Sequence, residues 1–332
     1  MAVRRREFVQ GIAGSAMAWP FAVRAQPSER THRIGALIAY AENDPETNFR
    51  IAAFRAGLAK RGWSEDHTVH IDYRFAAATT TLYPKLAKEL VSLHPEVILA
   101  HTTPAVVAIR QETNVIPTVF VNVSDPIGEG FVASLARPGA NLTGVLHYEQ
   151  SIVGKWLSML KEIAPQTSRI ALVANPKTSP FDYFLKAAQQ MALQLAIEIV
   201  PSPVTNSAAD IEHLLNAIAQ TPNSSLVITP DGTTIQHRDL IVSLAAKYRL
   251  PAVYPFDFFV LAGGLMSYGT DQNDMFRLAA SYVDRILRGD KPADLPVQAP
   301  TRFEMSLNVK TAKAMGLTVP PGLIVAADSV IE

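Results

Sequence analysis

The chain has 332 residues, 18% of them charged, and its 30 basic residues balance its 30 acidic residues. Cysteine is absent, which excludes disulfides, thiolate metal sites and cysteine nucleophiles. The sequence contains neither a basic stripe nor a tail of like charge, so it does not indicate nucleic-acid binding. Its length and composition favour two globular domains of ordinary size.

The first 25 residues are typical of an export signal. Arginines at 4–6 precede an apolar run of 13 residues, 11–23, and Ala25 supplies a small residue at the expected cleavage point. The order Arg5-Arg6-Glu7-Phe8-Val9 resembles the twin-arginine signal. The apolar run is shorter than the ~20 residues that span a bilayer. We therefore expect cleavage near Ala25 and a periplasmic mature chain, residues 26–332, with a net charge of −3.

The first part of the mature chain alternates short apolar runs with helical patterns. Runs rich in β-branched residues predict strands buried on both faces, and apolar residues spaced three or four apart predict helices. The helix at 48–61 is expected to bury Phe49, Ala52, Ala53, Ala56 and Leu58. In chain order we expect strand 31–40, helix 48–61, strand 69–75, helix 82–93, strands 96–100 and 118–123, helix 131–136 and strand 142–146.

The second part continues the same alternation. Its first helix has Trp156, Leu157, Leu160 and Ile163 on one face. Near the end, Gly289 stops a helix before a loop at 291–300. In chain order we expect helix 153–163, strand 169–174, helix 181–195, strand 196–201, helix 208–220, strand 225–229, helix 235–248, strands 251–255 and 265–268, helix 275–287, strand 303–307 and helix 309–315.

Three strand patterns occur twice, which indicates two similar lobes. The runs beginning at Arg33, Val97 and Ile116 return at offsets of 136, 129 and 134 residues. Each half therefore predicts an α/β lobe with a Rossmann-like, doubly wound parallel sheet, and two facing lobes form a cleft.

The last third is too small for a core of its own, so both lobes must share it. The chain then crosses between lobes near 147, 269 and 297, and these crossings predict a three-strand hinge of parallel strands. This places 32–147 plus 270–296 in lobe 1 and 148–269 plus 297–332 in lobe 2.

Candidate ligand-binding residues follow the carboxyl ends of the predicted strands, where open α/β sheets bind ligands. Hydroxyls and amides that open a helix can receive a carboxylate, a buried carboxylate can pair with an ammonium, and rings can stack on a flat ligand. The candidates are Tyr40, Glu42, His101, Thr102, Thr103, Ser124, Asp125, Asp231, Tyr254, Phe256, Tyr268 and Asp271.

Each candidate also has a purely structural interpretation. Thr102 and Thr103 can be helix caps, and Asp125 and Asp231 can cap the turns that follow them. The aromatic residues can belong to the core. Glu42 and His101 can be solvated residues at the rim of the cleft, and Asp271 can serve the hinge.

Other motifs carry little weight. The segment 128–133 matches the dinucleotide-binding pattern G-x-G-x-x-A, but it does not open the first βαβ unit. His67 and His70 point to opposite faces of a strand, so they do not form a metal site. No nucleophile–base pair with a third supporting group is recognisable. The sequence therefore predicts no enzyme activity, cofactor or metal.

Several segments together resemble a known family. They are Arg33-Ile34-Gly35, Thr103-Pro104-Ala105, the run 123–128, Gly264-Leu265-Met266-Ser267-Tyr268-Gly269 and the run 308–317. The mature chain resembles the periplasmic substrate-binding proteins of ABC transporters, in the group typified by tryptophan- and tyrosine-binding proteins.

The resemblance implies a type I periplasmic binding protein fold and capture of a small solute. Its expected ligand carries a carboxylate and is an aromatic or apolar amino acid. Its expected partner is a membrane permease, and we expect a monomer. Two alternatives remain open: a ligand sensor that signals to a membrane receptor, and an exported hydrolase or transferase that depends on Ser124 or His101. A cytoplasmic repressor is excluded by the export signal and by the lack of a helix-turn-helix ahead of Arg33.

Overall fold

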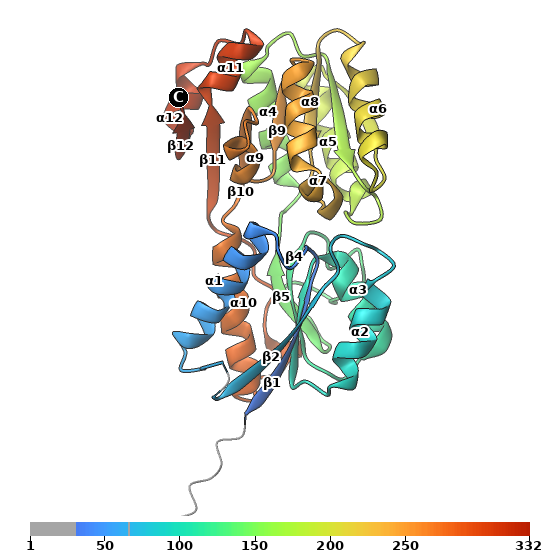
Figure 1. Ribbon diagram of the computed structural model, residues 1–332, viewed down its shortest axis with the longest axis vertical. Coiled ribbons are helices and arrows are strands. Elements are labelled where there is room, and N and C mark those ends of the chain that lie inside the picture. Colours follow the sequence, from blue (N-terminus) through green and yellow to red (C-terminus); the bar gives the residue numbers. More distant parts are fainter. Residues whose placement is uncertain (1–30, 66) are drawn as a thin grey trace, which may run out of the picture.

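The computed structural model describes residues 31–65 and 67–332, which form two α/β lobes stacked along the long axis of the molecule (Figure 1). The predicted export signal lies outside the described residues. Among the described residues, none of the helices has both the length and the hydropathy that crossing a bilayer requires.

Lobe 1 contains a sheet of five parallel strands in the order β2-β1-β3-β4-β5. Helices α1 and α10 pack together beside it, α10 against β3, β4 and β5, while α2 and α3 form a second pair (Figure 1). The strands are β1 (His32–Ile38), β2 (Val69–Phe75), β3 (Val97–His101), β4 (Thr118–Val123) and β5 (Leu142–Leu146). The helices are α1 (Pro45–Ala59), α2 (Tyr83–Ser92), α3 (Thr103–Glu112) and α10 (Gln272–Leu287).

Lobe 2 contains a seven-stranded sheet in the order β12-β11-β10-β9-β8-β6-β7. Its strands are β6 (Arg169–Ala174), β7 (Glu198–Pro203), β8 (Ser224–Ile228), β9 (Ala252–Tyr254), β10 (Met266–Thr270), β11 (Phe303–Asn308) and β12 (Ser329–Ile331). The helices are α4 (Ser151–Ile163), α5 (Phe181–Leu195), α6 (Ala208–Ala219), α7 (Gly232–Gln236), α8 (Arg238–Lys247), α9 (Asp257–Leu261), α11 (Val309–Met315) and α12 (Pro321–Ala326). A short 3-10 turn, η1 (Pro292–Asp294), precedes the last crossing.

The chain crosses between the lobes after β5, after β10 and before β11. Thr270 and Phe303 are paired, and β10 and β11 run antiparallel, since one strand leaves lobe 2 and the other returns to it. The expectation of parallel hinge strands was therefore wrong. Gln298 still hydrogen-bonds with Gly144 and Leu146 of β5, so the return crossing follows residue 298.

One apolar cluster covers a face of each sheet and continues from lobe 1 into lobe 2. It includes Ala39 and Tyr40 after β1, and Tyr254 and Phe256 at the end of β9. Arg238 of α8 also forms an ion pair of 3.0 Å with Asp44, the residue that caps α1. The lobes are therefore in direct contact on the cleft side.

The structure corrects two expectations about elements and adds elements that the sequence did not predict. Residues 131–136 form no helix, because the amides of Phe131 and Val132 donate to Pro126 O and that of Ala133 donates to Pro138 O. The helix expected at 235–248 is divided into α7 and α8 at His237. Helices α9 and α12 and strand β12 were not expected.

The face that α1 buries also differs from the expectation. Phe49 is 60% exposed, whereas Arg50 is 1% exposed. The buried residues are Thr47, Arg50, Ala53, Phe54, Gly57 and Leu58. Because these positions recur three and four apart, they form one face, which turns Arg50 towards the interior.

Candidate functional site

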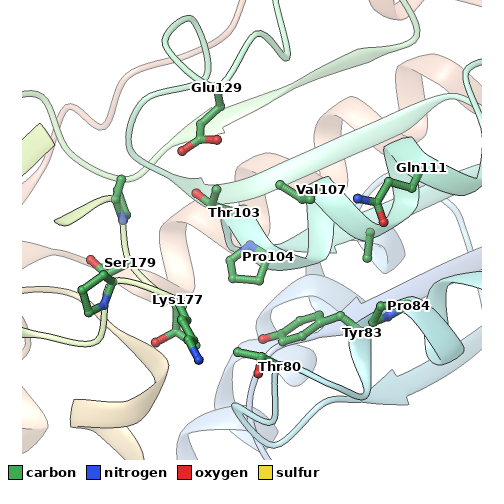
Figure 2. Close-up of a pocket in the computed structure, with 14 residues that line it drawn as sticks. Thr80, Tyr83, Pro84, Thr103, Pro104, Val107, Gln111, Glu129, Lys177 and Ser179 are labelled. Carbon is green, nitrogen blue, oxygen red and sulfur yellow. The ribbon is translucent and has the colours of Figure 1, made fainter. Parts of the chain in front are cut away.

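The cleft between the lobes has an open part and a buried part. The open part, here called the outer pocket, is a cavity of about 350 Å³. Figure 2 shows Tyr83, Thr103 and Pro104 of lobe 1 on one side and Lys177 and Ser179 of lobe 2 on the other. Residues from both lobes thus meet in one cavity large enough for a small solute.

Two features of the outer pocket favour polar contacts with a ligand. The Ser179 hydroxyl is buried and has no hydrogen-bond partner. Thr103 begins α3, and the N-cap residue Thr102 makes no side-chain capping bond. The first amides of α3 therefore lack a capping side chain. Thr102 also has φ +76° and ψ 161°, a conformation that costs about 1–3 kcal/mol in a residue other than glycine.

The buried part of the cleft, here called the inner cluster, consists of one guanidinium and five rings. It lies at the ends of β1, β3, β5 and β9 and on α1 and α9. The members of the inner cluster are Tyr40, Arg50, His101, His147, Phe256 and Phe258.

Arg50 has the most unusual environment in this cluster. Its three guanidinium nitrogens are buried and have no hydrogen-bond partner. Its Cζ atom lies 4.9 Å from the centre of the Tyr40 ring and 5.8 Å from that of Phe258. The nearest carboxylate, on Glu46, is 3.6 Å away, too far for a normal hydrogen bond. A buried cation in this state is costly unless a ligand anion or another acceptor pairs with it.

The two histidines of the inner cluster belong to a polar network at the hinge. Asn122 Nδ2 lies 3.1 Å from His101 Nε2 and donates to Gln272 Oε1, and Gln272 Nε2 lies 3.3 Å from His147 Nε2. Burial, together with the Arg50 charge, holds the pKa of His101 well below its ordinary value and lowers that of His147 to about 3. Both rings are therefore neutral at pH 7, and Arg50 is the charged member of the inner cluster.

Asp231 is buried beside the cleft and caps α7. Its carboxylate accepts hydrogen bonds from the amides of Asn175, Thr233 and Thr234 and from the Thr178 hydroxyl. Burial raises the pKa of Asp231 to about 6, although these donors oppose the shift. The hydrogen bonds of Asp231 are thus those of a residue that caps the turn after it. A contact between Asp231 and the ligand stays a prediction.

The other acidic candidates also have local partners or are exposed. Asp125 accepts from Gly128 N at 2.9 Å, and Asp271 caps α10 and pairs with Arg277. Glu42 is exposed. Their roles as ligand contacts are untested predictions.

The remaining candidates fall into three groups. The structure brings Tyr40, His101 and Phe256 together in the inner cluster. Elsewhere, Ser124 is buried, the Tyr254 ring stacks on Phe259, and the Tyr268 ring stacks on Phe303. Thr103 lies in the outer pocket, next to Thr102.

Sequence reasoning missed several residues of the cleft, with Arg50 the most important. A signal for it existed, because Thr47 and Arg50 are spaced like Ala53, Phe54 and Leu58 along one helix face. The other residues missed are Tyr83, His147, Lys177, Ser179 and Phe258.

The described part of the chain contains no group of three or more side chains that could hold a metal ion.

Comparisons with known proteins agree with this geometry. The family model for ABC transporter substrate binding proteins matches residues 38–331. A tyrosine-binding protein of Clostridioides difficile (strain R20291) is 22% identical over 290 residues, 87% of this chain and 82% of that protein.

Solved structures share the fold. The ABC domain in complex with L-Trp from Streptococcus pneumonia has a TM-score of 0.84 and 23% identity, covering 91% of this chain and all of that one. A conserved domain protein from Vibrio cholerae has a TM-score of 0.83 and 25% identity, covering 90% of this chain and 99% of that one.

The two parallel-sheet lobes around a shared cleft define a protein of the type I periplasmic binding class. Within this class, the chain belongs to the ABC transporter substrate-binding protein family. Members of this family bind small solutes outside the cytoplasm and interact with ABC permeases, and the family is one of binding proteins rather than of enzymes.

Proposed function

We propose that this protein captures a small carboxylate-bearing solute, an aromatic or apolar amino acid, and delivers it to the permease of an ABC importer. It acts in this proposal as a monomer in the periplasm after cleavage near Ala25. In this proposal lobe 1 comprises 32–147 plus 270–298 and lobe 2 comprises 148–269 plus 299–332, because Gln298 pairs with β5 of lobe 1.

The observation that carries the proposal is the buried guanidinium of Arg50 between rings of both lobes. A carboxylate supplies the hydrogen-bond acceptors that the guanidinium lacks, in a planar arrangement that matches its fork of donors. Apolar and aromatic side chains of a solute fit the surrounding rings of Tyr40 and Phe256. The names of the tyrosine-binding relative and of the L-Trp complex support an aromatic ligand.

Lobe closure couples binding to delivery in this proposal. The ligand meets Arg50 on α1 of lobe 1 and Phe258 on α9 of lobe 2, so its contacts are complete only when the lobes are together. Its differential affinity for that state shifts the population towards closure. The outer pocket, which opens between the lobes, is the entry route.

A thermal-shift screen of residues 26–332 tests this function. Amino acids, aromatic acids and small amides are added singly, and a ligand at 100 times its Kd stabilises the fold by about 2.7 kcal/mol. We expect hits among aromatic amino acids. If no carboxylate-bearing compound raises the melting temperature, the proposal fails; product formation would instead support an exported enzyme.

A further inference from the structure

Arg50 carries a positive charge inside the inner cluster, and no member of the cluster carries a negative charge. Arg50 is buried without a hydrogen-bond acceptor, and the neighbouring rings of His101 and His147 are neutral. The carboxylate of Glu46, 3.6 Å from the guanidinium, is half-buried. It lines a groove on the hinge side together with Phe49 and with Phe256 and Phe258 of the inner cluster. The guanidinium therefore has an ion-pair neighbour in Glu46 but no hydrogen-bond acceptor.

The carboxylates beside the cleft are already engaged. Asp231 accepts from four donors. Asp44 accepts from Glu46 N and pairs with Arg238 at 3.0 Å. Among the described residues, no fully buried carboxylate is thus left for an ammonium group. An ammonium transferred into the inner cluster would lose its hydration, and the carboxylate beside the cluster, on Glu46, already faces Arg50 at 3.6 Å.

We propose that Arg50 binds the carboxylate of the ligand and that the site has no group that recognises an α-ammonium group. An arylalkanoate then binds at least as tightly as the amino acid with the same ring. This inference rests on the proposed function, because it names the ligand chemistry of the same cleft.

The rings set the shape of the ligand. The Tyr40 ring lies on one side of the guanidinium, and the Phe258 ring contacts it from lobe 2. The Phe256 ring stacks on His147 with the ring centres 5.5 Å apart and the planes 15° apart. Flat surfaces of this kind favour a planar apolar body attached to the carboxylate.

Calorimetric titration of residues 26–332 with two matched sets of ligands tests the inference. One set is phenylalanine, 3-phenylpropanoate and phenethylamine; the other is tryptophan, 3-(indol-3-yl)propanoate and tryptamine. We expect each acid to bind with a Kd equal to or below that of the amino acid, and the amines to show no binding.

Variants of α1 assign the effect to Arg50. Arg50→Gln is expected to weaken binding of the acids at least 100-fold and Arg50→Lys at least tenfold, since an ammonium cannot pair bidentately. Arg55→Gln is the matched control, because Arg55 is exposed on the same helix, and it should change the Kd less than twofold. Glu46→Gln should likewise not weaken binding of the acids.

The melting temperature of the ligand-free protein distinguishes a ligand-binding role of Arg50 from a purely structural one. If Arg50 serves the ligand, removing this buried cation without a hydrogen-bond acceptor should leave the melting temperature unchanged or raise it. A fall of several degrees in Arg50→Gln, with ligand affinity retained in Arg50→Lys, would overturn the assignment.

The ligand sets separate the two proposals. If the amino acids bind at least tenfold more tightly than the acids, or if the amines bind, the inference is overturned and the cleft reads an ammonium. If neither acids nor amino acids bind the folded protein, the proposed function fails with it.

Discussion

At the residue scale, a glycine allows two segments of the backbone to approach closely where the chain crosses between the lobes. Gly269 lies in β10, just before the second crossing. A Cβ atom there would overlap Pro255 O and the Tyr148 hydroxyl. That hydroxyl donates to Pro255 O at 2.8 Å, so the glycine allows the segment after β5 to be tied to the end of β9.

We expect Gly269→Ala to lower the free energy of unfolding by about 1–3 kcal/mol, because the added methyl group overpacks this contact. Urea unfolding measures the change. Gly35→Ala in β1 is the control: its Cβ would meet side chains at an ordinary 3.4 Å, so it should cost clearly less. Equal losses in both variants would contradict the argument.

At the element scale, Asp231 joins two loops of lobe 2. It caps α7 and also accepts from Asn175 and Thr178, in the loop between β6 and α5. Both loops border the cleft, so one carboxylate fixes the lobe 2 side of the candidate site.

Asp231→Ala should lower the free energy of unfolding by about 2–3 kcal/mol, since it removes a helix cap and leaves buried donors unpaired. Ser207→Ala, which removes the cap of α6, is the comparison and should cost about 1 kcal/mol. Equilibrium unfolding followed by circular dichroism measures both. Equal costs would mean that the links to Asn175 and Thr178 contribute nothing.

The sequence predicts elements well where an apolar pattern is strong and local. Strands 69–75, 118–123, 142–146 and 169–174 and helix 181–195 match the structure at both ends. Each is a run whose burial follows directly from its own composition.

The failures depend on tertiary contacts. Residues 131–136 have a helical composition, but Pro126 and Pro138 provide the acceptors for their amides. Phe49 is expected to be buried, yet the α1–α10 contact buries Arg50's side of the helix. The spacing of Arg50 with Ala53 and Phe54 was a signal that it is buried, but only the packed fold shows that this face of α1, and not that of Phe49, is the buried one. By contrast, Tyr40, His101 and Phe256 were chosen for their strand-end position, and the structure brings these three rings together in the inner cluster.

At the scale of the whole molecule, few polar contacts between described residues join the lobes on the cleft side. The ion pair between Arg238 and Asp44 is the clearest, and both side chains are largely buried, at 21% and 14% exposed. It connects α8 of lobe 2 to the N-terminus of α1, the helix that carries Arg50.

Arg238→Gln should shift the ligand-free protein towards more open forms. A partly buried ion pair of this kind contributes about 0.5–1 kcal/mol, which corresponds to a two- to fivefold loss of ligand affinity. Small-angle X-ray scattering should show a larger radius of gyration without ligand. Arg169→Gln removes a pair within lobe 2 and should change neither quantity. An unchanged radius in Arg238→Gln would contradict a closing role.

The free energy of unfolding should also depend on pH, because two buried groups beside the cleft, His147 and Asp231, have shifted pKa values. Between pH 6 and 4 the unfolded chain protonates His147, whose ordinary pKa is 6.5, while the folded chain holds that pKa near 3. The histidine therefore lowers the free energy of unfolding by about 1.4 kcal/mol for each unit that the pH falls. Asp231 acts in the opposite direction, since its folded pKa of about 6 lies above its ordinary 3.8.

We therefore expect His147→Phe to flatten the dependence of stability on pH between 6 and 4, and Asp231→Asn to steepen it. Each change amounts to about 1.4 kcal/mol per pH unit. Urea unfolding at several pH values measures both slopes. The same slope in His147→Phe as in the unsubstituted protein would show that this ring is protonated in the fold.

The sharing of the last third of the chain between lobes has a consequence for the order of folding. Helix α10 supplies Met275, Phe276, Ala279 and Val283 to the apolar layer that covers one face of the first sheet. A nascent chain that has reached only β10 already contains most strands of the second sheet, but that face of the first sheet still has no α10 to cover it. Lobe 1 therefore cannot complete its apolar layer until a large part of lobe 2 has been synthesised, although its five strands come first in the chain.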